Sequence, residues 1–358
     1  MFKKFLVLLL ISSLFAVPVW ASEVEEPARV QYSSALRSAL RNRPEIVQFE
    51  NDLEDFQELR RSMQDMLEHL RRAGAPRPEQ VLELERQVAE LGSAINRMQI
   101  ARDMTRVGTE AQMRAGIIAV ENALLDIQLM EAELAHSRVN FEATELRFNA
   151  GLISESDLRS AELGLQQGEA NLAALRVSLE SDRHELNRIL QRPVTDYIYV
   201  AFDRELIELP ADLNAHVRRT AHRQVNVRMA DIAVNAARRA LRDFDTAFGT
   251  PERAAREREL NHAERSRAEA LRAVETSLRN HYNTLTMLMH NNESLKIELQ
   301  RAEERLEVVE LNYQAGLATP FEIEAAELAV LRAEVGIERN LNSFWSLQFL
   351  FQNPFIGA

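Results

Sequence analysis

Hydrophobic residues recur along this chain with the spacing of coiled-coil helices. One stretch steps alternately by four and three residues through Leu295, Leu299, Ala302, Leu306, Val309 and Tyr313. An earlier stretch has the same spacing at Met130, Leu134, Ser137, Phe141, Thr144 and Phe148. A third runs through Leu158, Ala161, Leu165, Gly168, Leu172, Leu175 and Leu179. Positions with this alternation form a narrow seam along a partner helix, so the pattern predicts long paired helices.

Glycine and proline clusters divide this pattern into helices of two lengths. The expected helices cover 28–72, 78–149, 154–191, 211–248, the stretch from Pro251 to Gln314, and 319–352. At 1.5 Å per residue, the helix over 78–149 would be about 105 Å long, about as long as its two shorter neighbours placed end to end. The predicted fold class is therefore all-α, built of antiparallel coiled-coil hairpins. At most one or two short strands are expected, and Thr195–Asp203 is the one clear candidate.

Two similar turns indicate that the chain contains two copies of one unit. The stretch RFNAGLISESDLRSAEL, residues 147–163, matches NYQAGLATPFEIEAAEL, residues 312–328, at an offset of 165. A weaker match, at an offset of 181, relates residues 36–46 to residues 217–227. Self-similarity of this size predicts two similar structural units. The chain is thus divided into a leader (1–21), a first helical repeat (22–196), a strand-containing connector (197–210) and a second helical repeat (211–358).

Each turn carries residues that end one helix and begin the next. Gly151 and Gly316 suit the left-handed conformation that is common just past a helix end. The segments Ser154–Asp157 and Thr319–Glu322 are capping-box patterns, and Pro320 is well placed at the first helical position. Helix punctuation alone therefore explains these residues locally, and any functional role would be additional.

The charge balance excludes one class of partner. The 358 residues carry a formal net charge of -12, and acidic and basic side chains are interleaved along the predicted helices. Binding to nucleic acid requires lysine and arginine clustered on one face, so no nucleic-acid partner is expected. The eight histidines are scattered, and no metal-ligand cluster, phosphate-binding loop or catalytic arrangement is legible. The chain is expected to be no enzyme and to use no cofactor or metal.

The first residues have the pattern of a signal peptide. Lys3 and Lys4 precede an apolar run over 5–17, and a cleavage site follows at Ala21. The apolar run is shorter than the roughly 20 residues that span a bilayer. The protein is therefore expected to be exported. Since the chain has no cysteine, neither disulfide formation nor lipoprotein acylation is expected.

The unit and its turns resemble the outer membrane efflux proteins of the TolC type. The likeness rests on the long helix against two shorter ones and on the aromatic-x-Ala-Gly-Leu turn followed by an acidic residue and alanine. The stretch LNRILQRP over 186–193 is also similar to the family's Leu-x-x-Leu-Leu-Gly-x-Pro end of repeat, with Gln191 in place of the glycine. The resemblance covers nearly all of the chain after the leader.

This resemblance implies a homotrimer whose twelve helices form a tunnel in the periplasm. It also implies two partners, a periplasmic adaptor (membrane-fusion) protein and an inner-membrane pump. The adaptor-docking tips would be formed by Gly151, Leu152, Gly316 and Leu317.

The resemblance also suggests residues that gate the tunnel. Asp157 and Tyr313 match positions where the family links its outer and inner hairpins, and Glu322 matches an acidic ring at the constriction. Ala318 and Ala325 stand where the family has a latch arginine and a second acidic residue. The implied gate would therefore have fewer charged contacts than is usual in the family.

The likeness fails at the opposite end of the hairpins. The family inserts membrane strands there, and one such strand needs ~9–11 residues. Only Ala73–Pro78 and Gly249–Pro251 are available at the two sites, and both have turn chemistry. The strands of the membrane barrel are therefore expected to be missing. The expected location is the outer membrane or the periplasm, and association with the outer membrane is left open.

These features favour two possible functions, one in transport and one structural. The first is a passive exit duct of an efflux or export system, which receives substrate from a pump through an adaptor. The alternative is a soluble periplasmic coiled-coil scaffold that no longer conducts. An adaptor protein is disfavoured, because adaptors need strand-rich domains.

Aromatic residues near the C-terminus form a separate cluster, which consists of Phe344, Trp345, Phe349, Phe351 and Phe355. They are expected to pack the end of the last helix against the strand region over 197–202. An interfacial membrane anchor is the other interpretation.

Overall fold

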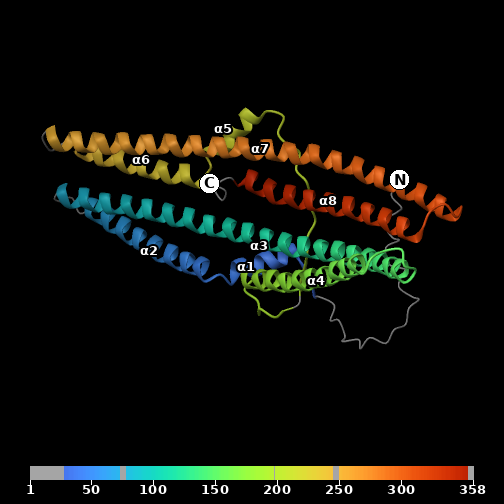
Figure 1. The fold of residues 1–358 in the computed structure, drawn as a ribbon. Coiled ribbons are helices and arrows are strands. Elements are labelled where there is room, and N and C mark those ends of the chain that lie inside the picture. Colours follow the sequence, from blue (N-terminus) through green and yellow to red (C-terminus); the bar gives the residue numbers. More distant parts are fainter. Residues whose placement is uncertain (1–27, 73–77, 197, 245–249, 354–358) are drawn as a thin grey trace, which may run out of the picture.

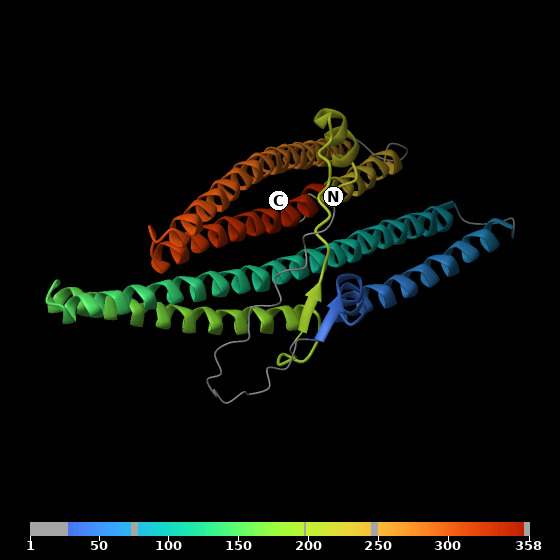
Figure 2. The same ribbon diagram turned by 90° about the vertical axis from the view of Figure 1, so that its right-hand side faces the viewer.

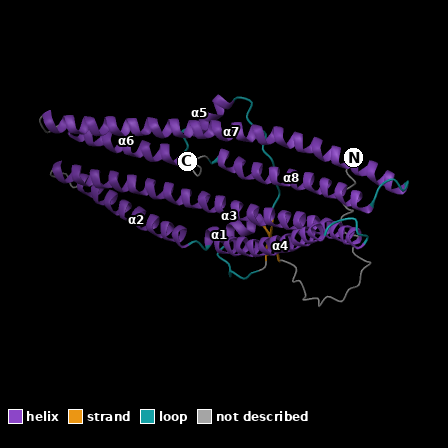
Figure 3. Ribbon diagram, in the orientation of Figure 1, coloured by secondary structure: helices purple, strands orange, loops and turns teal. Residues whose placement is uncertain are grey.

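The computed structural model of this chain describes residues 28–72, 78–196, 198–244 and 250–353. Two short strands and eight helices make up this part of the chain (Figures 1 and 3). They are β1 (Ala28–Gln31), α1 (Tyr32–Arg41), α2 (Pro44–Arg72), α3 (Pro78–Asn149), α4 (Glu155–Ile189), β2 (Ile198–Ala201), α5 (Leu213–Ala221), α6 (Val225–Phe244), α7 (Thr250–Gln314) and α8 (Pro320–Gln352). The all-α prediction is confirmed. The predicted leader, the residues 73–77 and the residues 245–249 lie outside the described part.

Each half of the molecule packs one long helix along shorter ones, as predicted. In the first half α3 lies against α2 and α4, and in the second half α7 lies against α6 and α8. The halves lie side by side in an elongated molecule, because α3 also contacts α8 and α6 (Figure 1). Both Ala-Gly-Leu turns are found at the same end of the molecule.

Two of the expected helices are interrupted. The prediction of one helix over 28–72 is wrong, because β1, α1 and α2 occupy this range. Pro44 begins α2, and proline disfavours the helical conformation of the residue before it. The range 211–248 likewise holds α5 and α6 instead of one helix. The two interruptions lie at equivalent positions of the two repeats. Adding the offset of 181 to Pro44, the first residue of α2, gives Val225, the first residue of α6.

The strands join the beginning of the described chain to the connector. β1 pairs in parallel with β2, with Ala28 opposite Ile198 and Gln31 opposite Ala201 (Figure 2). β2 lies inside the predicted strand region, whereas β1 was expected to be helical. The β-propensity of β1 is low, so its conformation depends on a partner that lies far away in the sequence.

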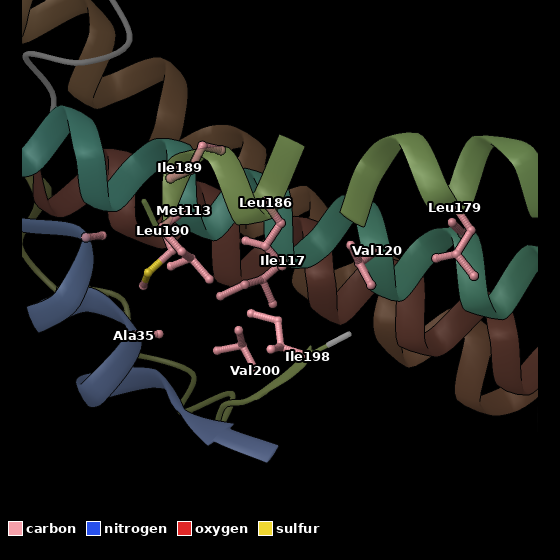
Figure 4. Close-up of a cluster of buried hydrophobic side chains, with 12 residues drawn as sticks. Ala35, Met113, Ile117, Val120, Leu179, Leu186, Ile189, Leu190, Ile198 and Val200 are labelled. Atoms are coloured by element: carbon pink, nitrogen blue, oxygen red, sulfur yellow. The ribbon is translucent and has the colours of Figure 1, made fainter. Parts of the chain in front are cut away.

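The predicted seam determines which face of α4 is buried. Between Leu158 and Leu179 the seven seam residues are buried or half-buried, and every residue between them is exposed. The seam continues into a core formed by α1, α3, the end of α4 and β2, which includes Met113, Ile117, Leu186 and Val200 (Figure 4). A second core, around Leu278 and Leu285 of α7, joins α5, α6 and the end of α8.

The C-terminal aromatic residues pack inside the protein. The ring of Trp345 lies 4.7 Å from that of Phe202, just after β2, and 5.9 Å from that of Tyr32. This is the packing against the strand region that was expected. Phe351 instead stacks on His216 of α5 at 4.7 Å. Phe355 lies outside the described residues.

Candidate functional site: the hairpin tips

The two tips are formed by the same backbone motif. Gly151 and Gly316 have φ angles of 72° and 74°, in the left-handed region that favours glycine. The amide of Gly151 donates to the carbonyl of Phe148, and the amide of Leu152 donates to that of Arg147, at 2.8 and 2.9 Å. These two bonds form a Schellman motif, which satisfies carbonyls at the helix end. The prediction for Gly151 is thus confirmed.

The second tip repeats this geometry. The amide of Gly316 donates to the carbonyl of Tyr313 at 2.9 Å, and the amide of Leu317 donates to that of Asn312 at 2.8 Å. Because both long helices end in the same way, the two hairpins turn back with equal geometry. Leu152 and Leu317, which follow the two glycines, therefore occupy equivalent positions in the two turns.

Both following helices begin with a capping box, as predicted. At α4 the amide of Asp157 donates to Ser154 Oγ at 3.3 Å, and the amide of Ser154 donates to Asp157 Oδ2 at 3.1 Å. At α8 the amide of Glu322 donates to Thr319 Oγ1 at 3.4 Å, and the amide of Thr319 donates to Glu322 Oε2 at 2.7 Å. Each carboxylate thus satisfies a backbone donor of its own helix terminus.

These hydrogen bonds lower the pKa values of both carboxyl groups. The bonds from Ser154 hold the pKa of Asp157 below its ordinary value of 3.8. The bonds from Thr319 hold the pKa of Glu322 below its ordinary value of 4.5. A lowered pKa means that each cap stabilises the folded state above the ordinary pKa, and that this contribution is lost as the pH falls through the lowered pKa.

We therefore expect the first turns of α4 and α8 to fray only in strong acid, below the ordinary carboxyl range. The check is an NMR titration of both carboxyl groups together with amide exchange at the two helix starts. Asp157→Asn and Glu322→Gln are the matched controls, and each should abolish the pH dependence at its own tip alone. Carboxyl pKa values at or above 3.8 and 4.5 would contradict the capping role.

Apolar side chains are exposed at the tips. Leu152 and Leu317 are 73% and 79% exposed, and Leu146, one turn before the first tip, is 71% exposed. Tyr313 is also exposed, beside the second tip. A single exposed leucine needs no explanation, but a group of them at one end of the molecule is typical of an interaction surface.

The structure does not join the predicted gate residues to one another. Asp157, Tyr313 and Glu322 are all described, and no hydrogen bond or ion pair links Asp157 to Tyr313. Glu322 is engaged by its own helix start through Thr319. The gate assignment of these three residues stays a prediction.

Other residues link the two halves near the tips. The ring of His136 on α3 stacks on Phe321 of α8 at 4.4 Å, and its Nδ1 lies 3.9 Å from Glu324 Oε2. Further along the same helices, Arg332 pairs with Glu133 at 2.8 Å, and Arg339 pairs with Asp126. The sequence reasoning missed these contacts, because no local signal shows which face of α3 meets α8.

Metal-binding groups and long apolar helices are both absent from the part of the chain that the structure describes. Among the described residues, no group of three or more histidine, aspartate or glutamate side chains could hold a metal ion. No helix in the described ranges has an apolar stretch long enough to cross a membrane.

Solved structures with this architecture include outer membrane proteins and channels. No protein-family model and no curated protein matches the sequence. The outer membrane protein VceC from Vibrio cholerae is 15% identical with a TM-score of 0.62, over 91% of this chain and 96% of that one. The CmeC outer membrane channel of Campylobacter jejuni is 12% identical with a TM-score of 0.58, over 91% and 85%. CusC, whose structures describe transmembrane channel formation, is 12% identical with a TM-score of 0.63, over 89% and 94%. The chain therefore has the fold of these channel proteins.

Proposed function

We propose that this protein is a passive exit duct of an export system, which assembles as a homotrimer and docks an adaptor at its hairpin tips. The fold carries the proposal, because the solved structures that share it over nearly their whole length are channels and not enzymes. The described residues form two hairpins side by side, which would make only part of the wall of a tunnel. Several copies are needed to enclose a tunnel.

Exposed apolar residues at the two edges of the molecule support assembly. α4 contacts the rest of the chain mainly through α3, and α7 packs on α5, α6 and α8, so each has a face without a partner. The exposed apolar residues of α4 include Leu163 and Val177, and those of α7 include Met287, Met289, Ile297, Val308 and Leu311. Different surfaces that meet head to tail generate closed rings when the rotation closes.

The heights of these residues match along the hairpins. Val177 lies 26 residues after Gly151, and Met289 lies 27 residues before Gly316. At 1.5 Å per residue both lie about 40 Å from the tips. In a ring in which all tips point the same way, α4 of one copy would therefore bring Val177 level with Met289 on α7 of the next. The number three comes from the resemblance to TolC-type proteins.

Cross-linking tests this arrangement cleanly, because the natural chain has no cysteine. The variant with Val177→Cys and Met289→Cys should give a covalent trimer with a thiol-specific bifunctional cross-linker. Each single substitution alone should give at most a dimer. A double variant that remains monomeric would contradict the trimer, as would cross-linking that continues without limit into long polymers.

The second arm of the experiment tests docking and conduction. Leu152→Asp with Leu317→Asp should keep the trimer but abolish co-purification with the cognate adaptor, because charge is placed on the apolar tips. Leu206→Asp in the connector, also exposed, is the control.

Reconstituted wild-type trimer should conduct ions. A trimer without conductance, from a strain whose susceptibility to toxic compounds is unchanged by deletion, would identify the non-conducting scaffold instead.

The location follows from the same proposal. The duct would be exported by its leader and would lie in the periplasm, with its tips toward the inner membrane and its other end toward the outer membrane. Flow would be driven by the pump. Fractionation of tagged full-length protein, with adaptor and pump probed in the same fractions, checks this placement.

A further inference from the structure

We infer that a cavity beside α1 is a binding site for a phosphate ester that carries an apolar portion. The cavity has a volume of about 520 Å³, within the usual range for small-molecule sites. It lies between β1, α1 and the loop that follows α4, at mid-length of the molecule and away from the tips. The inference goes beyond the duct function and does not depend on it.

Three arginines line the cavity. Arg37 and Arg41 come from successive turns of α1, and Arg192 comes from the loop after α4. None of the eight residues that line the cavity is acidic. Planar guanidinium groups bind phosphate through pairs of parallel hydrogen bonds, so three of them around one space favour an oxyanion.

The hydrogen-bonding state of these arginines leaves donors available. Arg192 donates to Asp196 at 3.0 Å, and the Nε of Arg37 donates to the carbonyl of Ser33 at 3.2 Å. Within the described residues, neither terminal nitrogen of Arg37 has a partner, and Arg41 has no side-chain hydrogen bond. A ligand would therefore meet several unused N–H groups.

Two hydroxyl groups lie on the same face of α1. Ser34 and Ser38 are one turn apart, and they alternate with Arg37 and Arg41 along the helix. The hydroxyl of Ser38 accepts a bond from Asn42 at 3.4 Å, which leaves its own proton free to donate. A phosphate monoester has three terminal oxygens, each a strong acceptor. It could use these donors more fully than a carboxylate, which has two oxygens.

The remaining wall is apolar. Val30, Ala35 and Leu190 line it, and Ala35 and Leu190 belong to the buried core of the first half (Figure 4). Inorganic phosphate would leave this wall unused. The combination therefore points to a ligand in which a phosphate is joined to a small apolar group, as in a phospholipid headgroup region.

A second cavity differs in the pairing of its arginines. It lies between α6 and α7, has a volume of about 380 Å³, and is also lined by two arginines, Arg238 and Arg267. Here each arginine is neutralised, because Arg238 pairs with Glu264 at 2.8 Å and Arg267 pairs with Asp231. Two acidic partners line that cavity. In the cavity beside α1 Arg192 is paired with Asp196, and Arg37 and Arg41 leave an unbalanced positive charge in a protein that is acidic overall.

The test is calorimetric titration of the full mature protein at constant ionic strength with three probes. They are inorganic phosphate, dihexanoyl phosphatidic acid and the zwitterionic dihexanoyl phosphatidylcholine. Saturable binding of phosphatidic acid at least tenfold tighter than that of phosphate supports the site and indicates a lipid source. Equal affinities of phosphatidic acid and phosphate would show that the apolar wall adds nothing, and would overturn the inference of an ester with an apolar portion. No saturable binding of inorganic phosphate or of phosphatidic acid, or equal binding of phosphatidylcholine and phosphatidic acid, also overturns it.

Matched variants tie the binding to the cavity. Arg37→Gln with Arg41→Gln should weaken binding at least tenfold, because charged hydrogen bonds are lost. Both side chains are exposed, so the fold should be kept, and circular dichroism would verify this. Arg218→Gln with Arg219→Gln removes the same charge from α5, the corresponding helix of the second half, and should leave affinity unchanged. Equal affinities of the two double variants for phosphatidic acid would overturn the assignment.

Discussion

Replacing Leu278 by alanine is expected to lower the free energy of unfolding by about 2–5 kcal/mol, since it leaves a cavity in a closely packed core. Leu278 lies at the centre of α7 and is 0% exposed. Its neighbours in the second core include Val274, Leu285 and Phe351. These come from two helices, so the cavity could not close without moving one helix against the other. Urea denaturation followed by circular dichroism measures the change.

Met287→Ala is the control for this prediction. Met287 lies on the same helix but is 65% exposed, so its loss should change the stability of the isolated chain by less than about 0.5 kcal/mol. Met113→Ala should resemble Leu278→Ala, because Met113 is fully buried in the first core. The two cores are separate clusters, so the double variant should show additive losses. Equal effects of Leu278→Ala and Met287→Ala would show that the second core is not packed as described.

Arg114→Ala should be the second severe substitution, with an expected loss of about 3 kcal/mol. The guanidinium carbon of Arg114 lies 4.3 Å from the ring centre of Trp345 and 4.3 Å from that of Phe349. Its Nη2 also lies 3.2 Å from Glu110, which accepts a bond from the Tyr32 hydroxyl at 2.8 Å. Removing the cation would expose two aromatic faces to each other and leave Glu110 with a partly buried charge.

Arg114→Lys tests whether the charge of Arg114 or its planar shape stabilises this contact. Lysine keeps the positive charge but lacks the flat surface that stacks between two rings, so an intermediate loss is expected. Trp345 is the reporter, because the only other tryptophan, Trp20, lies in the predicted leader. Its fluorescence in the cleaved protein would therefore report this one junction. A lysine variant as stable as the wild type would show that stacking contributes nothing.

Local patterns predicted much of this structure for physical reasons that can be named. The seam residues of α4 were identified because burial along a paired helix follows a fixed period. The helix ends at Gly151 and Gly316 were identified because few residues adopt a positive φ. The capping boxes at Ser154 and Thr319 depend on residues only three positions apart. In each case the cause and the effect lie within a few residues of one another.

What was missed depends on distant partners. β1 is a strand because β2 lies beside it, and the two are separated by the whole first half. The contacts of His136 with Phe321 and of Glu133 with Arg332 join residues almost 200 positions apart. One sequence cannot show which faces meet at such a distance. The gate residues Asp157, Tyr313 and Glu322 were assigned by resemblance, and the capping contacts of Asp157 and Glu322 are local, so a test of gating needs the assembled protein.

The pairing of β1 with β2 sets an order for folding. Ala28 cannot meet Ile198 until 170 further residues are available, and contacts of such long sequence separation form slowly. A protein chain is synthesised from its N-terminus, so β1 cannot pair until α3, α4 and β2 have all been made. The pairing of β1 with β2 then joins the beginning of the first half to its end. The connector that follows β2 is therefore held against the first half only after that whole half has been made.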